Sequence, residues 1–443
     1  MLSRRLCIPS NYSSLCISRS MSLPSHNPYF QVGGKDIWSL INETAAAAEQ
    51  ESGRKNANLG QGFFSYSPPD FAIEAAKNAL DVAGNNQYAP AKGRPSLVQA
   101  IIDTYSPAYG RQLTKDEVLV TTGANEGMLS CFFGFIAPGD EVIVFEPFFD
   151  QYISNIEMPG GKVKYVQLHP PADFDKRTVS GDEWTIDWNE LEAAISPKTK
   201  MIVLNTPHNP IGKVFNKQEL QRIGDLAVKH NFLILSDEVY ENLYYNDFTR
   251  VALLSPEIGK RTVTVGSAGK TFAATGWRVG WLIGDKEVIQ YCALAHTRIC
   301  FSTPNVMQEA TAQALQLART NDYYEKTRKE YINKYKIFTA VFDELGLPYT
   351  VADGGYFLLV NLKKVEIPKD AELPKEIEHK PRDFKLAFWL IKQFGVVSIP
   401  PSEFYLPGNA HVIEDCLRFA VCKDDSVLEE AVERLRLLKA YIK

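Results

Sequence analysis

Short apolar segments alternate with helix-like segments between about residues 72 and 325, and this alternation constrains the fold more than any other feature of the chain. A strand that is apolar along its whole length is buried on both faces, and helices between the strands can cover it. The pattern predicts an α/β fold with a mostly parallel sheet, whose ligands bind at the carboxyl ends of the strands. The strand-like segments are 116–120, 141–145, 200–204 and 232–235, and the clearest helical ones are 95–105 and 217–230.

The rest of the chain predicts further units around this sheet. With 443 residues, 45% of them hydrophobic, the chain can form a large core and two or three packed units. A charged helix over 326–345 and strand-like segments at 354–360 and 416–421 predict a smaller α/β domain. We therefore predict a leader or tail at 1–25, an N-terminal arm with part of the small domain at 26–71, a large domain at 72–325 and a small domain at 326–443.

Composition argues against three kinds of partner or site. The net charge is −5 and no Lys/Arg-rich run occurs, so nucleic acid is not a predicted partner. No segment approaches the roughly 18 consecutive apolar residues of a membrane helix, so no membrane association is predicted. The seven cysteines are scattered and form no CxxC pair, so neither a disulfide framework nor a metal site is predicted.

The first 35 residues differ in composition from the rest of the chain. They contain Arg4, Arg5, Arg19 and many serines, and no acidic residue precedes Asp36. This composition is typical of a mitochondrial presequence, and a disordered tail is the alternative. Translation from Met21 would remove most of the pattern, so the predicted location is mitochondrial, cytoplasmic or both.

Lys270 follows the strand-like segment 261–266, with Ser267 three residues before it and Arg278 eight residues after it. A lysine in this position can hold an aldehyde cofactor as a Schiff base, while the hydroxyl and the guanidinium bind that cofactor's phosphate. The alternative is an ordinary loop lysine beside a Ser/Gly turn. Burial and a cationic cofactor ring should lower the pKa of Lys270 from its usual value of about 10.4, which suits a catalytic base.

Asp237 lies directly after another buried strand and Tyr240 follows three residues later. A carboxylate in such a place is costly unless a cation neutralises it, and the protonated nitrogen of a pyridine ring is such a cation. Tyr240 can donate to the hydroxyl of the same ring. The alternatives are a helix N-cap for Asp237 and a packed aromatic for Tyr240.

Three more stretches place suitable groups after predicted strands. Gly123 and Ala124 join a strand to a helix, where backbone N–H groups can bind a phosphate. Phe149 ends a strand and can stack on a planar ring. Asn205 and Asn209 flank a Pro-rich turn and can bond a ring oxygen. A plain strand–helix turn, core packing and turn chemistry are the respective alternatives.

The chain resembles the fold-type I pyridoxal-phosphate enzymes of the class I/II aminotransferase family. The stretches that carry the resemblance are Asn58–Phe63, Glu146–Asp150 and Gly266–Phe272, and they are most similar to kynurenine aminotransferases, also called glutamine transaminase K or cysteine-S-conjugate β-lyase. The leader suggests a eukaryotic, fungal member. The resemblance implies a pyridoxal-phosphate-binding large domain at 72–325. It also implies transfer of the amino group of an aromatic or large apolar amino acid, L-kynurenine in particular, to a 2-oxo acid, giving kynurenic acid.

The resemblance also implies roles for individual residues. Lys270 would be the Schiff-base lysine, and Arg418 would bind the substrate carboxylate. The other implied cofactor-binding residues are Gly123, Ala124, Asn125, Phe149, Asn209, Asp237, Tyr240, Ser267 and Arg278, and the other implied substrate-binding residues are Gly62, Asn205, Trp38 and Phe301. Tyr88 would reach the phosphate of the neighbouring subunit, which implies a homodimer with shared active sites.

Two rival functions remain open from the sequence. The first is β-elimination from cysteine conjugates, which would use the same site residues. The second is a non-catalytic regulator that has kept the fold as a binding module. No added DNA-binding segment or basic patch supports the second rival.

Overall fold

The computed structural model describes residues 25, 27, 29, 30 and 36–443. The chain divides into two units, Met1–Asp36 and Ile37–Lys443, and all helices and strands described below belong to the second unit. The predicted leader at 1–25, apart from Ser25, and the alternative start at Met21 lie outside the described residues. Within the described part of the chain, no helix combines the length and the apolar character that crossing a membrane requires.

An eight-stranded sheet lies at the centre of the large part of the second unit, in the order β2-β10-β9-β8-β7-β3-β4-β6. The adjacent strands β9, β8, β7, β3 and β4 run parallel, whereas β10 and β6 run antiparallel to their neighbours. The predicted α/β fold with a mostly parallel sheet is therefore confirmed. The strands are β2 (Val118–Thr121), β3 (Glu141–Glu146), β4 (Lys162–His169), β6 (Thr185–Ile186), β7 (Thr199–Asn205), β8 (Leu233–Asp237), β9 (Thr262–Ser267) and β10 (Gly280–Ile283).

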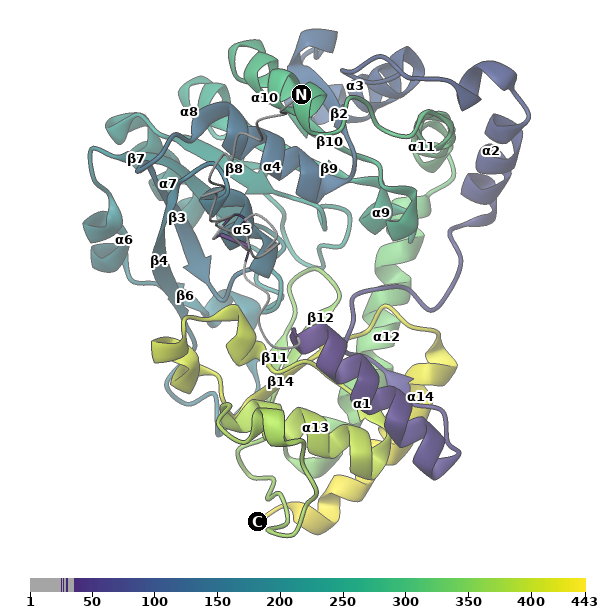
Figure 1. Cartoon of the computed structure of the whole chain (residues 1–443), viewed down its shortest axis with the longest axis vertical. Helices are drawn as coiled ribbons and strands as arrows, with labels where there is room; N and C mark the ends of the chain where they lie inside the picture. Colours follow the sequence, from purple (N-terminus) through teal and green to yellow (C-terminus); the bar gives the residue numbers. More distant parts are fainter. Residues whose placement is uncertain (1–24, 26, 28, 31–35) are drawn as a thin grey trace, which may run out of the picture. The chain divides into compact units, whose positions relative to one another are not determined.

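The helices of this part cover the sheet, which explains why central strands such as β3 are buried along their whole length (Figure 1). Their ends are set by local sequence. Asn216 forms a capping box with Glu219 at the start of α7, and Asn231 ends that helix in a left-handed conformation just before β8. The helices are α2 (Asp70–Leu80), α3 (Pro95–Tyr109), α4 (Ala124–Phe135), α5 (Asp150–Glu157), α6 (Trp188–Ala194), α7 (Lys217–His230), α8 (Pro256–Arg261), α9 (Ala268–Thr271), α10 (Lys286–Ile299) and α11 (Asn305–Ala318).

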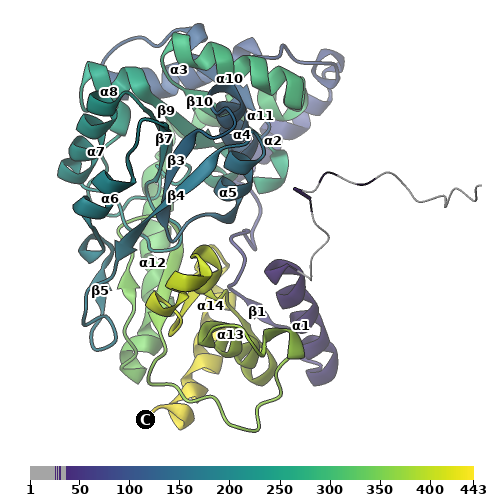
Figure 2. The same ribbon diagram turned by 60° about the vertical axis from the view of Figure 1, so that its left-hand side comes forward.

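A smaller group of helices and strands lies beside the large sheet, in the lower part of Figures 1 and 2. Two short sheets join distant segments there: β1 pairs with β13, and β12 pairs with β14. Its elements are α1 (Ile37–Ser52), β1 (Ala57–Asn58), α12 (Tyr323–Leu345), β12 (Phe357–Asn361), α13 (Arg382–Phe394), β13 (Val396–Val397), β14 (Cys416–Ala420) and α14 (Asp425–Leu435), and a further pair is β5 (Val179–Ser180) with β11 (Thr350–Val351). The predicted domain boundaries at 71/72 and 325/326 stay a prediction, because residues 37–443 form one compact unit.

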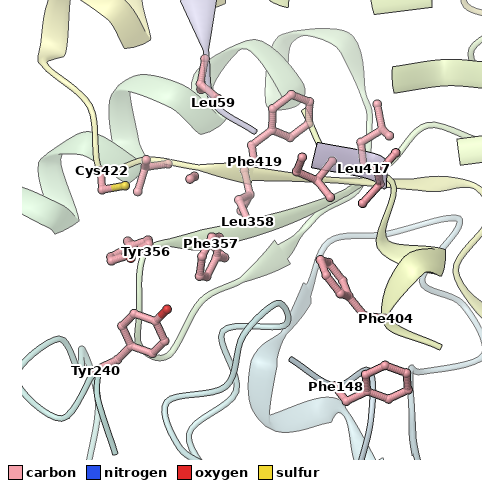
Figure 3. Packing of buried hydrophobic residues seen from close by; sticks show 14 of the residues in the cluster. Leu59, Phe148, Tyr240, Tyr356, Phe357, Leu358, Phe404, Leu417, Phe419 and Cys422 are labelled. Carbon is pink, nitrogen blue, oxygen red and sulfur yellow. The ribbon is translucent and has the colours of Figure 1, made fainter. Parts of the chain in front are cut away.

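Aromatic side chains fill the space between the two groups of elements. In Figure 3 the rings of Tyr356 and Phe357 lie on the side of β12 that faces Tyr240, whereas Leu59 and Phe419 lie on its other side. The ring centroids of Tyr240 and Tyr356 are 5.0 Å apart, in an edge-to-face arrangement. This packing brings Tyr240, in the segment after β8, next to the start of β12.

Candidate active site

Three parallel strands end in polar side chains at one edge of the large sheet. Asn205 ends β7, Asp237 ends β8 and Ser267 ends β9. Asn205 pairs with Asp237 in the register of β7 and β8, and Asp237 pairs with Val265 in the register of β8 and β9. The strand ends thus place the three side chains at neighbouring points of one sheet edge, as a parallel α/β sheet requires of its ligand site.

A cavity of about 270 Å³ opens at this edge. It has the lining expected of a small-molecule site, because aromatic side chains alternate with a few charged and polar groups. The predicted site residues that line it are Trp38, Gly62, Ala124, Asn125, Phe149, Asn205, Asn209, Asp237, Tyr240, Ser267, Lys270, Arg278 and Arg418. The structure therefore brings together residues from the N-terminal arm, the large sheet and the last strand of the chain.

Asp237 is a buried carboxylate that lacks a strong counter-charge. Its Oδ2 accepts a hydrogen bond from Tyr152 Oη at 2.5 Å, and its Oδ1 accepts one from the backbone N–H of Val239 at 3.3 Å. Burial raises the pKa of Asp237 to about 6, although these hydrogen bonds and the nearby Lys270 act in the opposite direction. A cation bound in front of Asp237, such as a protonated ring nitrogen, would restore its charged form.

Lys270 lies in the first turn after β9, where Ser267 caps the short helix α9. Its Nζ donates to Tyr356 Oη at 2.9 Å and lies 5.7 Å from the ring centre of Tyr240. Burial lowers the pKa of Lys270 to about 8. The direction agrees with the prediction from sequence, and a pKa near neutrality makes the neutral amine available as a base.

Gly123, Ala124 and Arg278 form a cradle suited to an anion. Gly123 has a φ of 81° and precedes α4, a twelve-residue helix whose N-terminus favours negative charge. A Cβ at Gly123 would lie 2.6 Å from Arg278 Nη2, so another residue there would have to displace this exposed guanidinium, and the positive φ also favours glycine. Ser267 lines the same cavity. These residues fit a phosphate group, and the ring of Phe149 and the carboxylate of Asp237 line the same cavity.

Arg418, on β14, is buried and keeps part of its hydrogen-bonding capacity unused. Its Nη1 donates to Asn209 Oδ1 at 3.0 Å and its Nη2 donates to the carbonyl of Gly60 at 3.0 Å. Its Nε is buried and has no hydrogen-bond partner among the described residues. Burial lowers the pKa of Arg418 to about 10, so the side chain stays charged at neutral pH. A carboxylate is the ligand that matches a guanidinium in this state.

Asn205 and Asn209 use their side chains differently. Asn205 Oδ1 accepts from the backbone N–H of Asn209 at 2.7 Å, and Asn205 Nδ2 donates to the carbonyl of Asp237 at 3.1 Å. Both polar atoms of Asn205 therefore bind backbone, which favours the turn-chemistry interpretation, and its role in substrate binding stays a prediction. Asn209 Oδ1 binds Arg418, so its amide nitrogen is the atom that could donate to a ring oxygen.

Comparison with known proteins agrees with this geometry. The sequence profile of the family "Aminotransferase class I and II" matches residues 54–435. The chain belongs to the class I and II aminotransferase family. Enzymes of this family depend in general on pyridoxal phosphate, and the anion cradle, Asp237 and Lys270 provide the groups that such a cofactor needs.

Relatives of this aminotransferase have been named in several organisms. The "Probable kynurenine--oxoglutarate transaminase BNA3" of Saccharomyces cerevisiae is 58% identical over 422 residues, which cover 94% of this chain and 95% of the yeast protein. The "Kynurenine--oxoglutarate transaminase" of Dictyostelium discoideum is 40% identical over 86% of this chain and 90% of that protein. The crystal structure of yeast Bna3p superposes with a TM-score of 0.93 at 57% identity and covers 95% of this chain and 100% of that chain.

Tyr88 and Phe301 do not line the cavity of the described chain. They contact each other instead, with ring centroids 5.5 Å apart, and expose 86% and 54% of their surface. The structure therefore does not bring Phe301 into the pocket of its own subunit. Two large exposed rings side by side are unusual on an isolated protein surface and are typical of an interface.

Sequence reasoning missed several groups at the site of this aminotransferase. Tyr152 binds Asp237, and Tyr356 binds Lys270. Tyr152 lies in the first turn of α5, three residues after the N-cap residue Phe149, and the two ring centroids are 5.5 Å apart. The other lining residues that were missed are Met128, Val239, Gly269, Thr275, Val279, Phe357 and Phe404.

One group of potential metal ligands comes together among the described residues, namely Glu126, His296 and Cys300. His296 Nδ1 lies 2.9 Å from Glu126 Oε2 and 3.4 Å from Cys300 Sγ. These contacts satisfy the three side chains as hydrogen-bond partners of one another. The prediction of no metal site stays a prediction.

Proposed function

We propose that this aminotransferase uses pyridoxal phosphate to transfer the amino group of L-kynurenine, or of another aromatic or large apolar amino acid, to a 2-oxo acid. Kynurenine would yield kynurenic acid. The names of the yeast and Dictyostelium relatives support kynurenine and oxoglutarate as the first substrates to test. The observation that carries the proposal is the surroundings of Arg418, which lines the cavity, has a buried Nε without a partner among the described residues, and lies among aromatic rings.

The substrate would bind through its carboxylate and its aromatic side chain. Arg418, which lines the cavity and has no carboxylate partner in the described hydrogen bonds, can donate to the α-carboxylate in a charge-assisted contact. Its guanidinium carbon lies 4.4 Å from the ring centre of Phe357, 4.9 Å from that of Phe404 and 5.8 Å from that of Trp38. An aromatic side chain next to the bound carboxylate would therefore meet apolar surface.

The cofactor would be held by residues that the structure brings together. Asp237 would bind the ring nitrogen, Phe149 would cover the ring face, and the cradle of Gly123, Ala124 and Arg278 would bind the phosphate. When bound, pyridoxal phosphate supplies an electron sink for the substrate Cα.

Lys270 would move the proton in both directions. Burial lowers the pKa of Lys270 to about 8, so its neutral amine becomes available at mildly basic pH. The neutral amine can take the Cα proton of the substrate and later return it. The hydrogen bond to Tyr356 Oη fixes one N–H of Nζ while this happens.

The decisive experiment is to incubate the purified holoenzyme with kynurenine and 2-oxoglutarate and to measure kynurenic acid. A panel of Phe, Tyr, Trp, Met and Gln would rank the amino donors, and Lys270→Ala is the control that should abolish turnover. Borohydride reduction followed by peptide mapping should find the cofactor attached to Lys270. Label on another side chain, or no amino transfer from any aromatic donor, would contradict the proposal.

The two rival functions give different results in the same assays. β-Elimination would release pyruvate from a cysteine conjugate without a 2-oxo acid, and it shares the site residues. A binding module would take up the cofactor and lose it in Lys270→Ala, yet transfer no amino group from any donor.

We also propose a homodimer in which the partner subunit's Tyr88 completes the phosphate site. The exposure of Tyr88 and Phe301 supports an interface at this face. Mixing Tyr88→Ala chains with Lys270→Ala chains tests the idea, because a mixed dimer would contain one complete site. Activity in the mixture above that of either variant alone is expected, and no gain would contradict sharing.

For the location we propose mitochondria, with a cytoplasmic form that starts at Met21. The support is the acid-free, Arg-containing start of the chain. Fusing residues 1–35, or the same segment starting at Met21, to a fluorescent protein would test it. Equal distribution of the two fusions would contradict a targeting role.

A further inference from the structure

Tyr356 contacts both the candidate base and the backbone of the substrate site. Lys270 Nζ donates to Tyr356 Oη at 2.9 Å, and Tyr356 Oη donates to the carbonyl of Gly62 at 3.0 Å. The ring is fully buried, edge-on to Tyr240 and stacked on Tyr331 (Figure 3). Because the packing fixes the ring, the position of its oxygen is fixed as well.

The segment 60–63 is bound at successive carbonyl oxygens by side chains from the C-terminal part of the chain. Arg418 Nη2 donates to the carbonyl of Gly60 at 3.0 Å. Lys423 Nζ donates to the carbonyls of Gln61 at 3.1 Å and Phe63 at 2.6 Å. Tyr356 binds the remaining carbonyl, that of Gly62. This segment borders the cavity through Gly62, so its position shapes the space next to Arg418.

We propose that Tyr356 is a positioning residue for amino transfer, which couples the direction of Lys270 Nζ to the position of the segment 60–63. This inference rests on the proposed function. Tyr356 does not itself line the cavity of the described chain, so it acts through Lys270 and Gly62. A neutral amine has one lone pair, and donation of one N–H to a fixed oxygen limits the directions in which that lone pair can point.

We expect the hydrogen bond to affect the proton affinity of Lys270 as well. An acceptor next to Nζ stabilises the ammonium form, so removing the acceptor should lower the pKa of Lys270. Lys423, in contrast, holds the same segment without contacting Lys270 in the described hydrogen bonds. The two side chains therefore allow the two effects to be separated.

The test compares Tyr356→Phe, which keeps the buried ring, with Tyr331→Phe, whose hydroxyl bonds Tyr66 Oη at 2.7 Å instead. In the holoenzyme, Tyr356→Phe should lower kcat by about 10- to 100-fold, as expected for a hydrogen bond to a charged or reacting group. It should also move the acidic limb of the kcat–pH profile to lower pH. Tyr331→Phe should leave kcat and the pH limb as in the wild type.

Lys423→Met provides the second arm, because methionine keeps the length of the side chain and loses both carbonyl contacts. We expect a higher KM for the amino donor and an unchanged pH limb. If the wild type is active and Tyr356→Phe has the same kcat and the same acidic pH limb, the positioning role of Tyr356 is overturned. The proposed function is then unaffected. Equal losses in Tyr356→Phe and Tyr331→Phe would also overturn the positioning role, since only packing would then matter. A wild type that transfers no amino group would instead overturn the proposed function.

Discussion

Arg250 and Arg418 of this aminotransferase have opposite surroundings. Arg250 lies between Glu238 and Glu241, and both carboxylates form ion pairs with it. Arg418 binds only an amide oxygen and a carbonyl oxygen, and its Nε has no partner among the described residues. Although burial opposes it, the two carboxylates raise the pKa of Arg250, whereas burial lowers the pKa of Arg418 to about 10.

The neighbouring acids Asp237 and Glu238 also differ in their partners, although burial raises the pKa of both. Glu238 points to Arg250 and accepts a hydrogen bond from Ser236, whereas Asp237 faces the cavity with Tyr152 as its side-chain partner. Charges behind the sheet edge are matched within the chain. Charges in the cavity are left for a ligand, and an unmatched buried charge is the better indication of function.

Asp237→Ala should show the largest effect on the cavity side of this comparison. Without the carboxylate the cofactor ring would lose its protonated nitrogen, so we expect kcat to fall beyond the roughly 10²–10⁴-fold of a single acid–base contact. Single-turnover kinetics with kynurenine would measure the loss. Near-normal turnover would show that Asp237 is no more functional than Glu238.

Arg250→Met should show the largest effect on the other side. The substitution leaves two buried carboxylates without a cation, which costs about 3–5 kcal/mol of unfolding free energy. Urea unfolding of wild type and variant would measure it. A variant as stable as the wild type would mean that the ion pairs of Arg250 with Glu238 and Glu241 do not stabilise the fold.

Arg418→Lys tests whether charge alone serves the substrate. Lysine keeps the charge and loses the planar fork, so we expect kcat/KM to fall by about 100-fold, with unfolding little changed. Steady-state kinetics with two amino donors would show it. Full activity in this variant would remove Arg418 from the carboxylate site.

The smallest effect concerns the pH dependence of the cofactor-free protein. Burial raises the pKa of Asp237 to about 6, above its unfolded value of about 3.9, so the folded state binds the proton more tightly. Ionised Asp237 therefore destabilises the folded state. This destabilisation is absent below about pH 4 and grows until the pH passes the folded pKa. Asp237→Asn should be more stable than wild type by about 1–3 kcal/mol at pH 8, and equally stable near pH 4. Urea midpoints between pH 4 and 8 would test the sign, and an advantage that grows toward low pH would contradict it.

The sequence predicted the strand ends well because local pattern decides them. The segment 200–204 became β7 at Thr199–Asn205, and the predicted helix 217–230 was reproduced as α7. Since parallel strands end at the same edge, Asn205, Asp237 and Ser267 could be placed together without coordinates.

The contacts made across distant segments could not be predicted in the same way. Tyr356 follows two glycines in a strand-like segment, and its contact with Lys270 joins the residue before β12 to α9, two segments far apart in the sequence. Phe301 was assigned to the pocket by resemblance, but the fold places it beside Tyr88 on the surface of its own chain. Which chain's pocket an exposed ring completes is a property of assembly and has no local sequence signal.

Gly123 in the anion cradle and the aromatic rings around Arg418 differ in how easily they can be substituted. In the anion cradle, the positive φ of Gly123 disfavours any other residue, and a Cβ there would also displace the guanidinium of Arg278. Around Arg418, rings such as Phe404 and Trp38 can be exchanged for others of similar size at a modest cost in stability. Enzymes that evolve from this one could therefore change their preferred amino donor through substitutions among the aromatic rings around Arg418, while the anion cradle stays unchanged.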